Sequence, residues 1–242
     1  MKKKVDVVYE DEYLVAVNKA AGILTIPDRF RKDIPNLYDL LSKERPELYT
    51  VHRLDKFTSG GILFAKDKDT HKKLSTLFMD RVPEKYYRAI VDGVPRDAEG
   101  EINKPLVEST VTRGKMLVHP RGKESKTTYQ ILDSYVKFSL LDVRIHTGRL
   151  HQIRVHLSHI GHPLMVDPLY GNRESFFLSE IKGRRFRMKQ DEEERPLLSR
   201  QPLHSHRLLL PHPQSEEPLQ LEFAIPKDMR AVIRQLEKIL KK

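Results

Sequence analysis

The spacing of apolar residues predicts alternating strands and helices in the first third of the chain. Residues 5–18 read as two strands around an acidic turn at residues 10–12. Residues 36–45 and 67–81 carry apolar side chains at the spacing of a helix face, and a proline follows each segment. The uninterrupted apolar run at residues 62–65 is typical of a buried strand, so we expect a strand between these two helices.

The rest of the chain is predicted to contain more strands than helices. The polar residues 109–125 are expected to form an exposed loop. A helix is expected after the turn at Gly148, with Ile153 and Leu157 facing inward, and an apolar stripe predicts a last helix from about Lys227. This pattern favours an α+β protein with a central mixed or mostly antiparallel sheet and flanking helices. We expect the strands at residues 85–93, 102–106, 126–132, 138–145, 204–208 and 219–223.

Composition narrows the function classes. The chain of 242 residues carries 44 Lys and Arg against 34 Asp and Glu, and this net charge of +10 suits a polyanionic partner such as RNA as well as simple solubility. Cysteine is absent, which excludes disulfides, thiolate nucleophiles and cysteine-based zinc sites. The sequence has no long apolar segment and no secretory signal, so we expect a cytoplasmic protein that does not enter a membrane.

One carboxylate stands out in the middle of residues 51–66. Asp55 is flanked by Arg53 and Lys56, which favour its ionised form. Gly60 and Gly61 follow, where the backbone can turn or approach a ligand closely. Taken alone, the stretch fits either a functional aspartate on a shaped loop or a solvated turn aspartate paired with a neighbouring arginine.

The residues around Asp55 favour the first of these two interpretations. The run His52-Arg53-Leu54-Asp55, followed by Thr58-Ser59-Gly60, resembles the central motif of the RluA family of RNA pseudouridine synthases. That resemblance implies that Asp55 is the essential catalytic residue. It also implies a pseudouridine synthase fold with a catalytic cleft, and we expect His52 and Arg53 to contact RNA.

A second motif is similar to a strand of the same family. Residues 85–93 resemble its Lys-x-Tyr-x-Ala-x-Val-x-Gly pattern, and the matching tyrosine is Tyr87. The resemblance implies that Tyr87 packs against the target base, whereas the residue type alone fits a core tyrosine. Strand alternation places Tyr87, Ala89 and Val91 on one face and Tyr86 on the other.

A third motif includes the predicted turn at Gly148 and the helix after it. Residues 147–157 resemble the family pattern Thr-Gly-Arg-x-His-Gln-Ile-Arg-x-His, and the family arginine that pairs with the catalytic aspartate matches Arg154. Arg149 and His151 lie at the predicted helix start, where N–H groups and the helix dipole favour phosphate, so we expect them to bind RNA.

The resemblance covers residues 5–226, with two departures. Ala20 stands where the family's first motif, whose role we expect to be mainly structural, usually has proline, and Val166 stands where it usually has glycine. The family's small S4 domain would precede the first strand, so we expect a single catalytic domain over residues 1–242 without it. Residues 172–201 are predicted to be an insertion with a basic and an acidic limb, which either clamps RNA or pairs with itself.

The motifs together imply an enzyme that isomerises uridine in an RNA stem-loop, ribosomal RNA or tRNA, to pseudouridine. The resemblance implies no cofactor and no metal, and we expect a monomer. Histidines at positions 151, 156, 159 and 162 invite a metal interpretation, but no carboxylate or cysteine accompanies them at ligand spacing.

Two other functions remain open from the residues. A glycoside hydrolase would need a second carboxylate opposite Asp55, and Asp167 is the nearest motif candidate, although its surroundings read as a structural turn. A non-catalytic RNA-binding or ribosome-assembly protein would need neither Asp55 nor Arg154.

Overall fold

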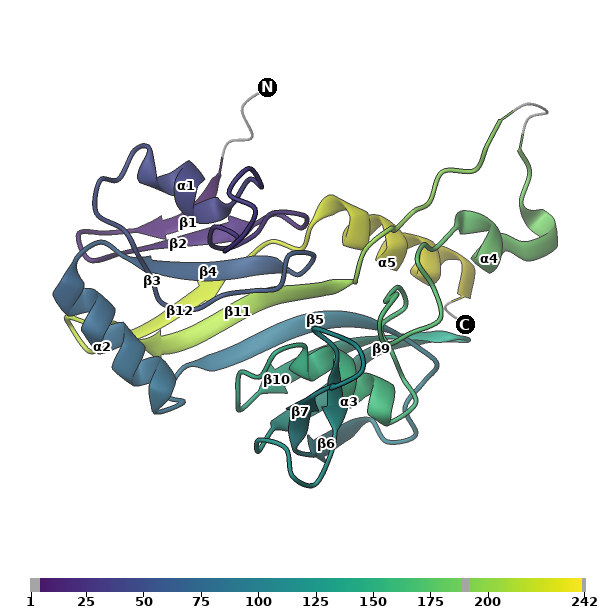
Figure 1. Cartoon of the computed structure of the whole chain (residues 1–242). Coiled ribbons are helices and arrows are strands. Elements are labelled where there is room, and N and C mark those ends of the chain that lie inside the picture. Colours follow the sequence, from purple (N-terminus) through teal and green to yellow (C-terminus); the bar gives the residue numbers. More distant parts are fainter. Residues whose placement is uncertain (1–4, 189–191, 241–242) are drawn as a thin grey trace. The chain divides into compact units, whose positions relative to one another are not determined.

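The computed structural model describes residues 5–188 and 192–240. It divides the chain into two compact units, each built from two separate segments (Figure 1). Unit 1 comprises the chain up to Tyr87 together with His204–Ala224, and unit 2 comprises Arg88–Leu203 together with the chain from Ile225 onward. Strands β5 and β11 therefore contribute residues to both units.

Unit 1 is organised around strand β4 (Ser59–Ala65), in which every residue is buried. β4 pairs antiparallel with β2 (Leu14–Lys19) and β3 (Tyr49–Thr50), and parallel with β11 (Leu203–Pro211). β1 (Asp6–Glu10) pairs with β2, and β12 (Pro218–Glu222) pairs with β11, both antiparallel. Residues at the start of β5 (Glu84–Asp92) complete the unit.

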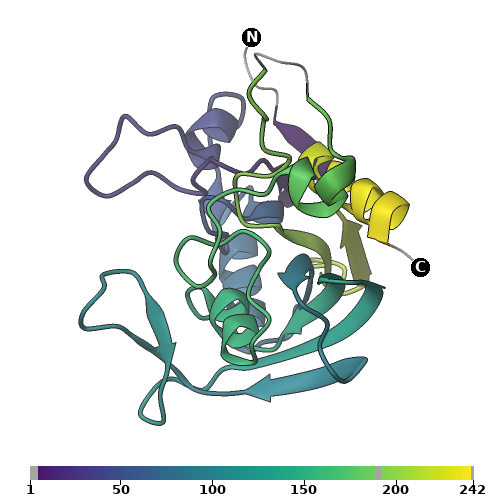
Figure 2. The same ribbon diagram turned by 90° about the vertical axis from the view of Figure 1, so that its right-hand side faces the viewer.

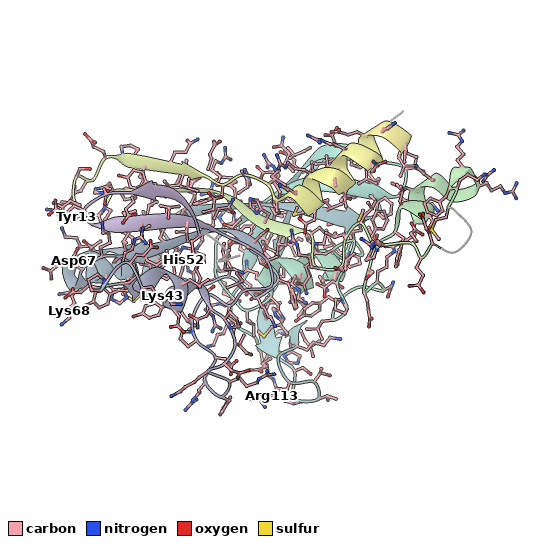
Figure 3. All side chains as sticks on the ribbon, turned by 90° about the horizontal axis from the view of Figure 1, so that it is seen from above. Tyr13, Lys43, His52, Asp67, Lys68 and Arg113 are labelled. Carbon is pink, nitrogen blue, oxygen red and sulfur yellow. The ribbon has the colours of Figure 1, made fainter. Side chains whose placement is uncertain are left out.

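Two helices of unit 1 begin at side-chain caps. The Asn36 side chain accepts the Asp39 N–H at the start of α1 (Leu37–Ser42), and the Asp67 side chain accepts the Thr70 N–H at the start of α2 (Lys68–Met79). Asp67 and Lys68, labelled in Figure 3, mark the start of α2. Leu74 of α2 packs into an apolar core with side chains of β2, β4, β11 and β12.

Two glycines explain how β4 and β11 come together. Gly60 has a φ of +115°, and a Cβ there would lie 2.2 Å from the Ser205 carbonyl oxygen. A Cβ on Gly61 would lie 2.1 Å from the Phe223 ring. The close approach expected from the Gly60-Gly61 pair is therefore made here to the protein's own β11 and Phe223.

Unit 2 contains an antiparallel meander and a small hairpin. β9 (Lys126–Tyr135) pairs with β10 (Phe138–Ile145) on one side and with β6 (Glu99–Asn103) on the other. The end of β5 belongs to this unit, and β7 (Leu106–Glu108) pairs with β8 (Met116–Val118) in a separate sheet.

The helices of unit 2 are α3 (Gln152–His159), α4 (Leu178–Lys182), a 3₁₀ turn (Gly183–Arg185) and α5 (Lys227–Leu240). The predicted stripe of the last helix is confirmed, because Met229, Val232 and Leu236 are fully buried. They share one apolar core with Val166, at the position of the second departure from the family pattern, and with β5, β9, β10 and α4.

The α+β class and the mostly antiparallel sheet are confirmed, with β4–β11 as a parallel pair. The prediction of an exposed loop over residues 109–125 is wrong in part, because β8 lies within it and buried Met116 packs against Leu106 and Val155. The predicted strand over residues 102–106 is also divided between β6 and β7, since Lys104 and Pro105 lie in neither.

The segment 172–201 is anchored in the core of unit 2. Phe176 pairs with Leu198 across the two limbs, and both side chains are buried. The basic limb contains α4 and the 3₁₀ turn, and the Glu194 carboxylate of the acidic limb accepts the Ser179 N–H at 2.8 Å. The predicted basic limb ends at Lys189 and the predicted acidic limb begins at Asp191, and both of these residues lie outside the described residues. The limbs are thus linked to each other, and a role in RNA binding stays a prediction.

Candidate active site

Asp55 lies on a loop whose backbone is fixed on both sides by an earlier segment of the chain. Before Asp55, the Thr25 hydroxyl donates to the Leu54 carbonyl at 3.1 Å and accepts the Leu54 N–H at 3.2 Å. After Asp55, the Lys56 carbonyl accepts the Gly22 N–H at 2.8 Å. Hydrogen bonds on both neighbours leave the half-buried Asp55 little backbone freedom.

Lys19 adds a buried cation to the same support. Its ammonium group donates to the carbonyls of Ala20 at 3.2 Å, Ile23 at 2.8 Å and Lys56 at 3.1 Å. Only 1% of Lys19 is exposed, so these carbonyls take the place of its lost hydration. Lys19, which precedes Ala20 in the first motif, therefore has a structural role, as expected for that motif. One of its hydrogen bonds holds the carbonyl of Lys56, the residue after Asp55.

His52 serves the packing of unit 1. Its Nε2 accepts the Leu63 N–H of β4 at 3.1 Å, and its ring stacks on Phe78 with centroids 4.7 Å apart. Burial, together with the charge of Lys85, lowers the pKa of His52 to about 3, so the ring is neutral at physiological pH. The Arg53 side chain is exposed. RNA binding by His52 and Arg53 stays a prediction.

Tyr87 is buried beside β11. Its phenol makes a hydrogen bond with the Ser205 hydroxyl, and burial together with the nearby Asp55 charge raises its pKa, so the phenol keeps its proton at neutral pH. The preceding residue of β11 is fixed as well, since His204 Nδ1 bonds the Ser59 hydroxyl at 2.9 Å. The sequence predicted only a strand at residues 204–208 and gave no signal for the contact between Ser205 and Tyr87.

The turn before α3 is held by a chain of side-chain hydrogen bonds. Gln152 Oε1 accepts the Thr147 hydroxyl at 2.6 Å, and Gln152 Nε2 donates to Thr127 Oγ1 at 3.0 Å. His156 bonds Thr127 Oγ1 through Nδ1 at 2.8 Å and the Lys104 carbonyl through Nε2 at 2.9 Å. Because a carbonyl only accepts, Nε2 carries the proton; burial lowers the pKa of His156, so Nδ1 of the neutral ring accepts the Thr127 hydroxyl. These motif residues are therefore structural.

Arg154 is held by a carboxylate that sequence analysis read as part of a turn. Its Nε and Nη2 donate to the two oxygens of Asp167 at 2.7 and 2.8 Å, and the exposed fractions of the two side chains are 5% and 0%. Asp167 Oδ1 also accepts the N–H groups of Leu169 and Tyr170, and the guanidinium carbon lies 4.9 Å from the Tyr170 ring centroid. The orientation of Arg154 is thus set by contacts within unit 2.

Arg149 and His151 lie beside this arrangement at the start of α3. Arg149 Nε donates to the Glu124 carbonyl at 3.1 Å, and His151, with a φ of +53°, is the residue before the first helical turn. His151 Nδ1 lies 2.9 Å from the Tyr170 hydroxyl, which also accepts the Met116 N–H at 2.7 Å. Both side chains are half-buried, and their binding to RNA phosphate stays a prediction.

The structure brings the predicted residues together in two groups. Asp55 and Tyr87 lie close enough in unit 1 for the carboxylate charge to act on the phenol. Arg149, His151 and Arg154 lie within a six-residue stretch of unit 2. The pairing of Arg154 with Asp55 stays a prediction.

Metal and membrane functions find no site in the part of the chain that the structure describes. Over residues 5–188 and 192–240, no group of three or more His, Asp or Glu side chains is arranged to hold a metal ion. Within the same ranges, no helix has the length and apolar character that crossing a bilayer requires.

Two solved structures have the same fold as this chain. The solved structure of Human RNA Pseudouridylate Synthase Domain Containing 4 aligns with a TM-score of 0.74 at 28% identity, covering 96% of this chain and 93% of that one. Human RNA Pseudouridylate Synthase Domain Containing 1 has the same fold, with a TM-score of 0.68 at 22% identity, covering 97% and 95%. The fold is therefore that of a pseudouridine synthase.

Sequence similarity shows the family. The family model described as RNA pseudouridylate synthase matches residues 13–159. Ribosomal large subunit pseudouridine synthase D of Zymomonas mobilis is 35% identical over 96% of this chain and 72% of its own length. Dual-specificity RNA pseudouridine synthase RluA of Vibrio cholerae is 40% identical, over 71% of this chain and 70% of its own. The chain belongs to the RNA pseudouridine synthase family, and it is an isomerase that converts uridine in RNA to pseudouridine.

Proposed function

We propose that Asp55 is the essential carboxylate of this enzyme and that its substrates are uridines in stem-loops of ribosomal RNA or tRNA. The observation that carries the proposal is the Asp55 loop itself, which is fastened by Thr25 before the aspartate and by Gly22 and Lys19 after it. A reactive group needs this kind of fixed placement, and a solvated turn aspartate does not.

The reaction breaks the bond between N1 of uracil and C1′ of the ribose, rotates the base, and joins C5 to C1′. The proton on C5 is lost and N1 gains a proton, so the product is an isomer of the substrate. Asp55 acts either as the nucleophile at C1′ or as the acid/base that moves a ribose proton. Arg154 pairs with Asp55 in the proposed complex and keeps its charge directed once the base excludes water.

Tyr87 packs against the target base and takes part in proton transfer at C5. Because its pKa is raised, the phenol holds its proton and acts as a hydrogen-bond donor at neutral pH. It can therefore accept the C5 proton only if its own proton passes on to another group.

The RNA must present the uridine outside a helix. A base in a duplex is inaccessible to active-site groups, so the target lies in a loop or is flipped out. The net charge of +10, Arg53, and the Arg149 and His151 pair supply phosphate contacts, and binding should weaken as salt rises. Relatives that are named for ribosomal RNA and for dual specificity support the choice of substrate. We also propose that the enzyme is a cytoplasmic monomer.

Pseudouridine mapping tests the proposal. Ribosomal RNA and tRNA are mapped from cells with the wild-type gene, without it, with Asp55→Asn and with Asp69→Asn, an exposed carboxylate of α2 that serves as the matched control. We expect the same one or few pseudouridines to disappear in the deletion and in Asp55→Asn, and to remain in Asp69→Asn. Full modification by Asp55→Asn would refute the assignment of Asp55.

The alternatives predict different results. A non-catalytic ribosome-assembly protein would leave the map unchanged while RNA binding persisted. A glycoside hydrolase with Asp167 as second carboxylate is disfavoured, because both Asp167 oxygens are engaged by Arg154 and the side chain is fully buried.

A further inference from the structure

One large aromatic side chain of unit 1 stands in solvent. Phe30 is 78% exposed and lies in the segment of residues 26–35, here called the Phe30 loop. The loop connects β2 to α1 and extends away from the strands of its own unit (Figure 2). An exposed phenylalanine forgoes the hydrophobic stabilisation that burial would give, and its ring is accessible to a ligand.

The exposure is built into the loop. The Asp28 carboxylate accepts the N–H groups of Phe30 and Arg31, both at 2.9 Å, and so forms a turn at the tip. These hydrogen bonds lower the pKa of Asp28 and keep it ionised. The turn fixes the backbone on which Phe30 is presented.

The two ends of the Phe30 loop are fastened to each other. Leu24 pairs with Asn36 in a parallel bridge, and the Leu24 carbonyl accepts the Leu37 N–H at 2.8 Å. The Thr25 carbonyl accepts the Tyr38 N–H at 3.1 Å. The residues on either side of the Phe30 loop are therefore held together by backbone hydrogen bonds, and the loop projects from them.

The neighbours of Phe30 are cationic. Arg29, Arg31 and Lys32 are exposed, and the Arg29 guanidinium lies 5.9 Å from the centroid of the Phe30 ring. The Arg31–Asp33 pair at 3.3 Å is highly exposed on both sides and is therefore weak. An aromatic face among arginines and lysines is the arrangement with which proteins hold unpaired bases and the adjoining phosphates.

The base of the loop touches the Asp55 loop. Thr25, which bonds both backbone groups of Leu54, is five residues before Phe30 and one step from the loop's first residue. Five residues span at most about 18 Å. Phe30 is thus in reach of nucleotides that neighbour a uridine bound at Asp55.

We propose that the Phe30 loop is an RNA subsite, in which Phe30 stacks on an unpaired base beside the target uridine and Arg29 and Lys32 contact the adjoining phosphates. The proposal rests on the proposed function for the location of the target. The cations favour RNA over an apolar protein partner as the occupant.

Binding without turnover provides the test. In the Asp55→Asn background, Kd is measured for an RNA stem-loop with uridines in its loop and for a fully paired duplex of the same length. We expect Phe30→Ala to weaken stem-loop binding about five- to thirty-fold and duplex binding less than two-fold, because only unpaired bases can stack on the ring. Phe30→Tyr should restore binding, and Phe30→Leu should restore little of it.

Matched variants separate stacking from other effects. Arg29→Ala should weaken both RNAs and reduce the slope of log Kd against log salt by about one. Met79→Ala, an equally exposed apolar residue at the end of α2, and Lys72→Ala, an exposed cation of the same helix, should change neither Kd.

Stem-loop binding by Phe30→Ala that equals that of the unmutated background would overturn the proposal, and so would an equal loss on both RNAs. Recovery of binding with Phe30→Leu would also refute stacking. The mapping experiment with Asp55→Asn reports separately on the proposed function, because these binding measurements require no catalysis.

Discussion

The Asp55 loop of unit 1 and the Arg154 segment of unit 2 both carry motif residues, but they are fixed by different contacts. Backbone groups of Leu54 and Lys56 are held by Thr25, Gly22 and Lys19, which lie 29 to 37 residues earlier in the chain. The loop contributes only backbone groups to these bonds.

The Arg154 segment is fixed by its own side chains. Gln152 and His156 bond to Thr127 of β9, and Arg154 is clamped by Asp167 thirteen residues later. Two segments with equally strong motif matches can therefore be held in place in different ways. In unit 1 the groups that hold the backbone on both sides of Asp55 lie outside the central motif, whereas in unit 2 the side chains of the motif make most of the supporting contacts themselves.

The largest effect on stability is expected from Asp167→Asn. The substitution keeps the shape of the side chain but removes the negative charge that the Arg154 guanidinium, 5% exposed, contacts at 2.7 and 2.8 Å. Breaking a buried ion pair costs about 3–5 kcal/mol of the free energy of unfolding. Urea unfolding followed by circular dichroism measures this, since the chain has no tryptophan.

Asp33→Asn is the matched control for that prediction. Asp33 pairs with Arg31 at 3.3 Å, but both side chains are about 70% exposed. Its loss should cost less than about 1 kcal/mol. Equal costs for the two variants would mean that the Arg154 clamp contributes nothing beyond an ordinary surface pair.

A smaller loss of stability but a clear loss of activity is expected from Lys19→Met. The change leaves the Ala20 and Ile23 carbonyls without the ammonium donor, at a cost of about 1–3 kcal/mol. It also releases the Lys56 carbonyl beside Asp55, and we expect the single-turnover rate of pseudouridine formation to fall about ten-fold or more, with RNA affinity kept.

Lys66→Met controls for the loss of a lysine from the same unit. Lys66 donates to the Asp11 carbonyl and pairs with Glu10. Neither of these partners belongs to the Asp55 loop. It should lower stability without changing the rate per folded molecule. A normal rate in Lys19→Met, measured well below its unfolding temperature, would show that the backbone bond to Lys56 does not position Asp55.

The smallest effect is expected from the pH dependence of His52. Its pKa is about 3 when folded and about 6.5 when unfolded, so protons bind preferentially to the unfolded chain. The stability that comes from the neutral ring is complete above pH 6.5 and is lost as the pH falls from there toward 3. Between pH 7 and pH 5 the loss is about 1 kcal/mol after allowance for the partial exposure of the ring.

Comparison with His52→Gln isolates this contribution. The variant should lose less stability than the wild-type protein between pH 7 and pH 5 in urea unfolding. His156, whose pKa is also lowered, contributes equally to both proteins and cancels in the difference. Identical pH dependence in the two proteins would refute the assignment to His52.

The sequence by itself determined most of the element types, the α+β class and the family, and it selected Asp55 and Tyr87 as candidate site residues. These depend on local periodicity and on short motifs whose letters are adjacent in the chain. The helix at Lys68–Met79, with its Asp67 cap, and the buried stripe of Lys227–Leu240 are cases in which local pattern was sufficient.

Only the tertiary structure decided which residues support the site. Thr25 and Leu54 are 29 positions apart and Ser59 and His204 are 145 apart, so no periodicity links them. The hydrogen bond between Tyr87 of β5 and Ser205 of β11 likewise joins residues that are far apart in the chain. Hydrogen bonds and close approaches between distant segments follow from the fold as a whole, because the chain must fold before those groups can meet.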